Sequence, residues 1–187
     1  MTVRIGYMGI PFSNSEEAAA VFAARRGWTD YTLVPLVSAA GVVGALDDGT
    51  ADWGVLALSN IAAGEVGETA EALEGRTDLI AEDRITVPIH HCLFVRTADR
   101  PIVRLVSHPQ ALTAGYLARQ YPQAVRENCA DTALAAEYLA AGKYPAGTAA
   151  VCRRNAGEHY CLVLAAENIE DRRDNMTSFG LVRRGPA

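Results

Sequence analysis

Residues 53–60 read Trp-Gly-Val-Leu-Ala-Leu-Ser-Asn, an apolar run that ends in two polar side chains. An unbroken apolar run of this length is typical of a strand buried on both faces, as in a parallel sheet. Strands of this kind alternate with helices in α/β proteins. The segment therefore predicts an α/β fold in which Ser59 and Asn60 lie at the carboxyl end of a central strand.

The segments around this run repeat a strand–helix rhythm. Strands are predicted at 3–8 and 31–37, and helices at 15–26 and 38–46, with serines placed to cap both helices. A third helix is predicted at 64–73. Because right-handed crossovers link such units, the first part of the chain predicts a parallel sheet covered by helices.

The regular alternation of predicted strands and helices ends at residue 79. The predicted strands 79–85 and 89–96 are long enough to cross between two lobes. Further strands are predicted at 103–106, 125–129, 148–152, 162–166 and 177–182, and further helices at 109–120, 132–141 and 155–159. We expect a single domain over 1–187, with one lobe formed by about 1–80 plus 166–187 and the other by about 81–165.

Polar segments follow several of the predicted strands. Ligands of open parallel sheets bind beyond the carboxyl ends of the strands, and two lobes joined by crossing strands create a cleft there. The sequence therefore predicts a binding site between the lobes. It is expected to be built from residues 13–15, 59–60, 107–110, 131–132 and 177–178.

Composition and charge argue against several functional classes. The formal net charge is −5 and no basic tract is present, which argues against nucleic-acid binding. No apolar run reaches the roughly 18 residues that a membrane span needs. The chain begins directly as a strand, so we expect no signal peptide and a cytoplasmic location. His90-His91 has no acidic partner at ligand spacing and no phosphate-loop pattern occurs, so no metal and no cofactor are expected.

Several segments resemble the signatures of the prephenate dehydratase family. Residues 107–112 match its Ser-His-Pro-Gln-Ala-Leu in full, and residues 7–15 are similar to its opening Tyr-Leu-Gly-Pro-x-Gly-Thr-Phe-Ser. Residues 56–69 resemble its Val-Pro-Ile-Glu-Asn-Ser segment, and residues 168–179 resemble Asn-Ile-x-Asp followed by Asn-x-Thr-Arg-Phe. The resemblance implies a two-lobed fold of the periplasmic-binding-protein type (type II), prephenate as substrate, and a homo-oligomer, expected to be a dimer.

The chain departs from the family within these motifs. Ser59 stands at the motif glutamate, Ile61 at the motif serine, and Ser178 at the motif arginine. The phenylalanine-sensing ACT domain that usually follows is not expected. In the family, the threonine at Thr177 is the expected hydrogen-bond donor to the leaving hydroxyl, while an arginine at 178 would supply a fixed cation.

These departures resemble the non-aromatising prephenate decarboxylases of antibiotic (bacilysin-type) and other secondary metabolism. The function expected from that resemblance is a lyase that removes carbon dioxide from prephenate and leaves a dihydro-4-hydroxyphenylpyruvate. One alternative is an ordinary prephenate dehydratase that forms phenylpyruvate in phenylalanine biosynthesis. A second alternative is a non-catalytic domain that binds a small acid.

The expected site residues fall into two groups. Thr177 and Ser178 are expected to be catalytic. Arg153 is hypothesised to replace the missing motif arginine, the alternative being a solvated surface group. The expected substrate-binding residues are Ser13, Ser15, Asn60, Ser107, Gln110, Ala111, Thr132, Arg153 and Phe179.

Overall fold

The computed structural model describes residues 2–172 and 174–185, and the chain divides into two compact units. The first unit joins Met1–Ile89 to Met176–Ala187, and the second comprises His90–Asn175. Both boundaries lie later in the chain than the expected 80/81 and 165/166. The reason is that strand β5 (Leu79–Pro88) pairs with strand β11 (Met176–Arg184) along its whole length, so both strands belong to the first unit.

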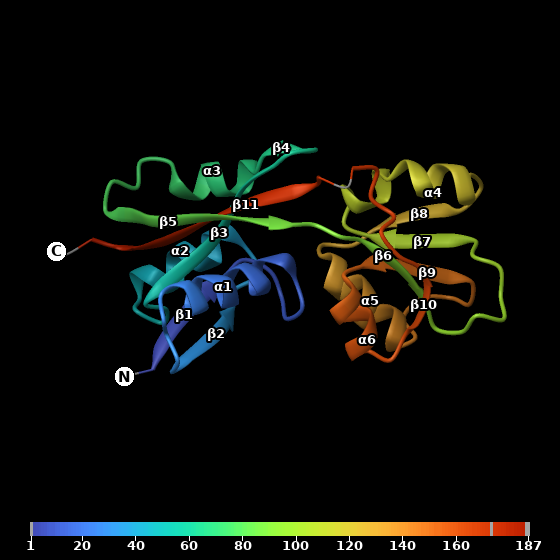
Figure 1. The fold of residues 1–187 in the computed structure, drawn as a ribbon, viewed down its shortest axis with the longest axis horizontal. Helices are drawn as coiled ribbons and strands as arrows, with labels where there is room; N and C mark the ends of the chain where they lie inside the picture. The colour runs from blue at the N-terminus through green and yellow to red at the C-terminus, as the bar shows by residue number, and fades with distance from the viewer. Residues whose placement is uncertain (1, 173, 186–187) are drawn as a thin grey trace. The chain divides into compact units, whose positions relative to one another are not determined.

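The first unit is built on a mixed sheet with the strand order β2-β1-β3-β11-β5 (Figure 1). Strands β1 (Val3–Tyr7), β2 (Tyr31–Pro35) and β3 (Trp53–Asn60) are parallel, as their sequence predicts. The other edge of β3 pairs with β11, which runs antiparallel to both β3 and β5. The central strand is therefore parallel to one neighbour and antiparallel to the other.

Helices α1, α2 and α3 belong to this unit. Helix α1 (Asn14–Arg25) begins at Ser13, whose side chain accepts a hydrogen bond from the backbone N–H of Glu16, and α2 (Ala39–Asp47) begins at Ser38 in the same manner. Helix α3 (Gly67–Leu73) starts later than the predicted residue 64. The short strand β4 (Gly64–Glu65) takes the first residues because they pair with the end of β3.

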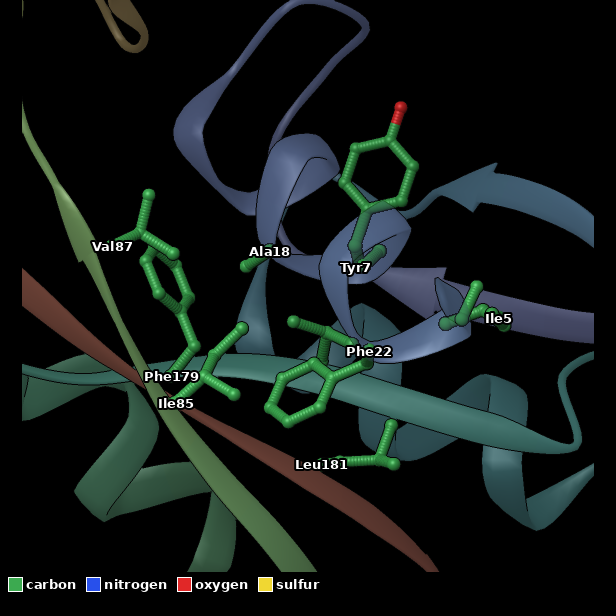
Figure 2. Close-up of a cluster of buried hydrophobic side chains, with 11 residues drawn as sticks. Ile5, Tyr7, Ala18, Phe22, Ile85, Val87, Phe179 and Leu181 are labelled. Atoms are coloured by element: carbon green, nitrogen blue, oxygen red, sulfur yellow. The ribbon is translucent and has the colours of Figure 1, made fainter. Parts of the chain in front are cut away.

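The two faces of this sheet carry separate hydrophobic clusters. On one face, α1 packs through Phe22 against Val55, Phe179 and Leu181, part of the cluster drawn in Figure 2. On the other face, α2 packs against alternate residues of the same strands, such as Leu56 and Val182. Because successive side chains of a strand point to opposite faces, each β11 residue can be assigned to the α1 face or the α2 face.

The second unit has a five-stranded sheet in the order β10-β6-β9-β7-β8. Strands β7, β8 and β9 are parallel, and β6 runs antiparallel to β9 and β10. The strands are β6 (Cys92–Val95), β7 (Arg104–Ser107), β8 (Val125–Asn128), β9 (Thr148–Cys152) and β10 (Val163–Ala166).

Helices α5 (Thr132–Ala140) and α6 (Arg154–His159) of this unit follow β8 and β9. The predicted helix at 109–120 is instead two pieces, a 3₁₀ turn (Ala111–Thr113) and α4 (Gly115–Gln120). They are separated by Ala114, whose ψ of 126° is not helical. The helical pattern of residues 109–120 therefore does not predict the break at Ala114.

Candidate functional site

The side chains of Asn60 and Thr177 are joined across neighbouring strands. The two residues are register partners at the carboxyl end of β3 and the start of β11. The Nδ2 atom of Asn60 donates to Oγ1 of Thr177 at 2.9 Å and to the backbone oxygen of Met176 at 3.1 Å. Its Oδ1 accepts from the backbone N–H groups of Ala62 and Ala63 at 2.9 and 3.0 Å.

These contacts occupy both N–H groups and both acceptor positions of the Asn60 amide. They also fix which way round the amide lies, because only Oδ1 can accept from the two backbone donors. The structure therefore assigns Asn60 to holding Thr177 in place. This differs from the expectation that the Asn60 amide binds substrate directly.

The hydroxyl of Thr177 is left with an unused donor. A hydroxyl carries one hydrogen and two lone pairs, and Asn60 occupies one of the lone pairs. Within residues 2–172 and 174–185, no group accepts a hydrogen bond from Thr177 Oγ1. The hydroxyl hydrogen is therefore available to an acceptor on a bound ligand.

Ser178 projects from the opposite face of the sheet. Thr177 pairs with Val87, which belongs to the cluster under α1, so Thr177 lies on the α1 face and Ser178 on the α2 face. Ser178 is the register partner of Ser59, the other position where the motif charge is replaced. The two expected catalytic residues, Thr177 and Ser178, therefore do not share a face of the sheet.

Arg84 of β5 contacts both of these serines. Its Nε donates to Ser178 Oγ at 2.6 Å, and its Nη2 lies 3.5 Å from Ser59 Oγ. Sequence reasoning does not select Arg84, because an arginine within a strand carries no motif. Only the pairing of β5 with β11 reveals that a guanidinium group lies beside position 178.

The remaining expected site residues of this unit serve the fold. Ser13 is the buried N-cap of α1, and Ser15 is buried in the first turn of that helix. The side chain of Phe179 is 1% exposed and packs in the cluster under α1, which indicates a core role, and the expected contact with substrate stays a prediction. Its place is set by the alternation of β11, which directs it into the cluster drawn in Figure 2.

In the second unit, Ser107 and Ala111 are also part of the interior. The hydroxyl of Ser107 is fully buried and donates to the backbone oxygen of Val151 at 2.6 Å. Ala111 is 3% exposed and belongs to a hydrophobic cluster with Leu105 and Leu117. Both side chains therefore have interior roles, and the expectation that Ser107 and Ala111 bind substrate stays a prediction.

Three other expected residues come together at one edge of the second sheet. Gln110 follows β7, Thr132 follows β8 and Arg153 follows β9, and these three parallel strands are neighbours. Gln110 is exposed, and its side-chain amide makes no hydrogen bond to any residue that the structure describes. Thr132 opens α5 beside Asp131, whose carboxylate caps the helix through the N–H of Ala133 at 2.6 Å. The edge thus carries a guanidinium, an amide and a hydroxyl that suit a carboxylate ligand.

Ionisable groups at this edge are shifted by their surroundings. Desolvation lowers the pKa of His91, and the neighbouring charges of Arg153 and His108 act in the same direction, while Glu170 opposes them. Burial raises the pKa of Asp131, against hydrogen bonds from the N–H groups of Ala133 and Leu134. Glu170 accepts from the backbone N–H of His91 at 2.9 Å and lies 2.8 Å from His90 Nδ1.

Two features are absent from the described part of the chain. No group of three or more His, Cys, Asp or Glu side chains there could hold a metal ion. No helix there has the length and apolar character that crossing a bilayer requires.

Comparison with known proteins places these features in a family. A sequence profile described as prephenate dehydratase matches residues 5–187. The chain is 34% identical over 190 residues to arogenate dehydratase 5, chloroplastic, of Arabidopsis thaliana, a match that covers 99% of this chain and 43% of the plant protein. A solved prephenate dehydratase from Arthrobacter aurescens, in complex with L-Phe, has a TM-score of 0.84 at 25% identity, covering 99% of this chain and 61% of that chain.

A periplasmic substrate-binding protein of an ABC transporter from Coxiella burnetii shares the fold alone, with a TM-score of 0.53 at 13% identity over 98% of this chain and 84% of that chain. The expected fold class, α/β of the prephenate dehydratase and periplasmic-binding-protein type, is confirmed. The chain spans 43% of the plant relative and 61% of the Arthrobacter chain, less than two thirds of either. Since the family profile and the plant relative each match nearly the whole chain, this protein belongs to the prephenate dehydratase family.

Proposed function

We propose that this chain catalyses the decarboxylating dehydration of prephenate or arogenate. In this reaction the bond to the ring carboxylate breaks and its electron pair forms a ring double bond. The ring hydroxyl leaves with the electron pair of its own C–O bond, takes up a proton and departs as water, so that the ring becomes aromatic. The observation that carries the proposal is the Thr177 hydroxyl, held by Asn60 with its hydrogen available.

Thr177 acts on the leaving oxygen. A threonine hydroxyl is a weak acid, so its contribution is a hydrogen bond that strengthens as negative charge develops on that oxygen. Such a donor is effective only when its direction is fixed beforehand. The saturated amide of Asn60 supplies that fixed direction.

Two charged residues of the family motifs are replaced by serines at neighbouring strand positions. Ser59 and Ser178 stand at the glutamate and arginine positions of the family motifs and are register partners. The chain therefore lacks one negative and one positive group of the motifs at facing positions. Both serines lie on the α2 face, whereas the Thr177 donor lies on the α1 face.

The second unit carries a candidate carboxylate-binding edge of its own. Arg153, Gln110 and Thr132 follow three adjacent parallel strands and offer donors to a carboxylate. The guanidinium of Arg153 places positive charge at this edge, which suits a carboxylate ligand. Lowering of the His91 pKa keeps that imidazole neutral near pH 7, so the permanent charge at this edge comes from the guanidinium.

A second candidate is decarboxylation without loss of water. It is favoured by Ile61, whose side chain is 53% exposed at a position where the family motif carries a serine hydroxyl, and by the uncharged Ser178. It has less support than dehydration, because the curated relatives of the chain are named as arogenate or prephenate dehydratases. The expected link to antibiotic biosynthesis has no support among them.

One assay separates these functions. The purified chain is incubated with prephenate and, separately, with arogenate, and carbon dioxide and aromatic product are measured in parallel. Dehydration releases both in equal amounts. Carbon dioxide without an aromatic ring would replace the proposal with the decarboxylase, and binding without either product would indicate a non-catalytic domain.

A further inference from the structure

The guanidinium of Arg84 links three neighbouring strands of the first unit. Arg84 lies on β5, its Nε donates to Ser178 of β11 at 2.6 Å, and its Nη2 approaches Ser59 of β3 at 3.5 Å. The strand order β3-β11-β5 means that this side chain reaches across the middle strand. A single side chain therefore contacts residues of two neighbouring strands from a third.

The serines that Arg84 holds adjoin the residues of the proposed chemistry. Ser59 precedes Asn60 and Ser178 follows Thr177, so the Arg84 contacts lie one residue away from both ends of the Asn60–Thr177 hydrogen bond. A change in the spacing of β3 and β11 at these serines would change the distance between Asn60 Nδ2 and Thr177 Oγ1. Misplacement by about 1 Å at such a point costs on the order of a hundredfold in rate.

The guanidinium of Arg84 contacts neutral hydroxyl groups. Within the described residues, no Asp or Glu side chain forms an ion pair with its guanidinium. The adjacent Asp83 is engaged elsewhere, accepting from the backbone N–H of Arg84 at 2.8 Å and pairing with Arg25 at 3.4 Å. The Nε bond to Ser178 is therefore a charge-assisted hydrogen bond without a competing anion.

We propose that Arg84 is the positioning residue that takes the place of the absent motif arginine. Here the guanidinium comes from β5 and reaches position 178 from the neighbouring strand, where the motif would place it on β11 itself. It acts by fixing the spacing of β3 and β11 beneath Asn60 and Thr177. The inference rests on the proposed function, and it assigns to Arg84 the replacement role hypothesised for Arg153.

The geometry favours positioning over direct contact with substrate. Ser178 and Ser59 lie on the α2 face, whereas Thr177 and Asn60 lie on the α1 face. Arg84 hydrogen-bonds to the two serines and so meets the sheet from the α2 face. Its effect on Thr177 therefore passes through the backbone of β11.

The test moves the guanidinium from position 84 on β5 to position 178 on β11. Arg84→Ala is expected to lower kcat by about ten- to a hundredfold with less than about a twofold change in KM, because the donor at Thr177 is misplaced while the carboxylate anchors remain. Arg84→Ala combined with Ser178→Arg returns a guanidinium to this position from β11 and is expected to recover most of the lost kcat. Arg4→Ala removes an exposed arginine from β1 of the same sheet and is the matched control, with kcat unchanged.

Two results would overturn the assignment. The first is a rise in KM at unchanged kcat in Arg84→Ala, which would make Arg84 a substrate contact. The second is a combined variant that unfolds at the wild-type urea midpoint but does not recover kcat, which would show that a guanidinium on β11 cannot replace the one on β5. If the unaltered chain lacks activity, the proposed function fails on its own. The coupling of Arg84→Ala and Ser178→Ala in a double-mutant cycle of unfolding then tests the contact independently, and strictly additive effects would exclude it.

Discussion

Asn60 Nδ2 donates a hydrogen bond of 2.9 Å to Thr177 Oγ1 across two antiparallel strands. The bond joins residues separated by 117 positions in the chain, and it is fixed at the Asn60 end by two backbone donors. It determines which way the Thr177 hydrogen points. Its removal should therefore change catalysis before it changes binding.

Replacing Asn60 by Asp tests the direction of this bond. A carboxylate keeps the acceptor for Ala62 and Ala63 but loses the Nδ2 donor, so the Thr177 hydroxyl turns to donate toward Asp. We expect kcat to fall by about a hundredfold or more with a small change in KM. Steady-state kinetics checks this, with Asn155→Asp at an exposed site as the control, and undiminished kcat in Asn60→Asp would contradict it.

Replacing Thr177 by Val tests the donor itself. Valine keeps the shape of the side chain and removes the hydroxyl, so formation of the aromatic product should fall by about 10²- to 10⁴-fold. Thr177→Ser keeps a hydroxyl and should retain a measurable part of the rate. The readout is aromatic absorbance alongside carbon dioxide. Equal activity in Thr177→Val and the unaltered chain would rule out this role.

Phe179→Ala distinguishes a core residue from a substrate contact. The side chain is 1% exposed and packs beneath α1 with Phe22 and Leu181, so its truncation leaves a cavity. We expect a loss of about 3–5 kcal/mol in the free energy of unfolding, measured by urea titration. A raised KM at unchanged stability would show that the residue contacts substrate after all.

The pKa of His91 predicts a pH dependence of stability. Its folded-state pKa is lowered from 6.5 by desolvation, so between that lowered value and 6.5 the unfolded chain binds more protons. The free energy of unfolding should be greatest above pH 6.5 and should decrease as pH falls through the lowered pKa. Urea midpoints from pH 8 to 5 measure the slope, and His91→Gln should flatten it, with His159→Gln as the control. An unchanged slope in His91→Gln would contradict this origin.

Local patterns predict the strand–helix order, but not the partners of each strand. The apolar run at residues 53–58 identifies β3, since its character depends on its own side chains alone. The insertion of β11 between β3 and β5 depends on segments about a hundred residues apart, which no local periodicity encodes. The same limit hides Arg84, whose contact with Ser178 spans 94 positions.

Motif matching identifies where the site residues lie, but not what each side chain does. Ser107 and Phe179 lie in family motifs, yet their side chains are turned inward by strand alternation. Asn60 also lies in a motif, and its amide is saturated by loop donors that follow it in sequence. Roles of this kind follow from the direction of a side chain, which is set only when the sheet has formed.

The central position of β11 has a consequence for how the chain acquires its structure on the ribosome. The second unit is one continuous stretch, His90–Asn175, and can organise as soon as it has emerged. The first unit emerges earlier, but β3 and β5 lack the strand that pairs with both of them until Met176–Arg184 has been synthesised. The unpaired edges of β3 and β5 make nascent chains that are stalled before residue 176 prone to aggregation and dependent on chaperones.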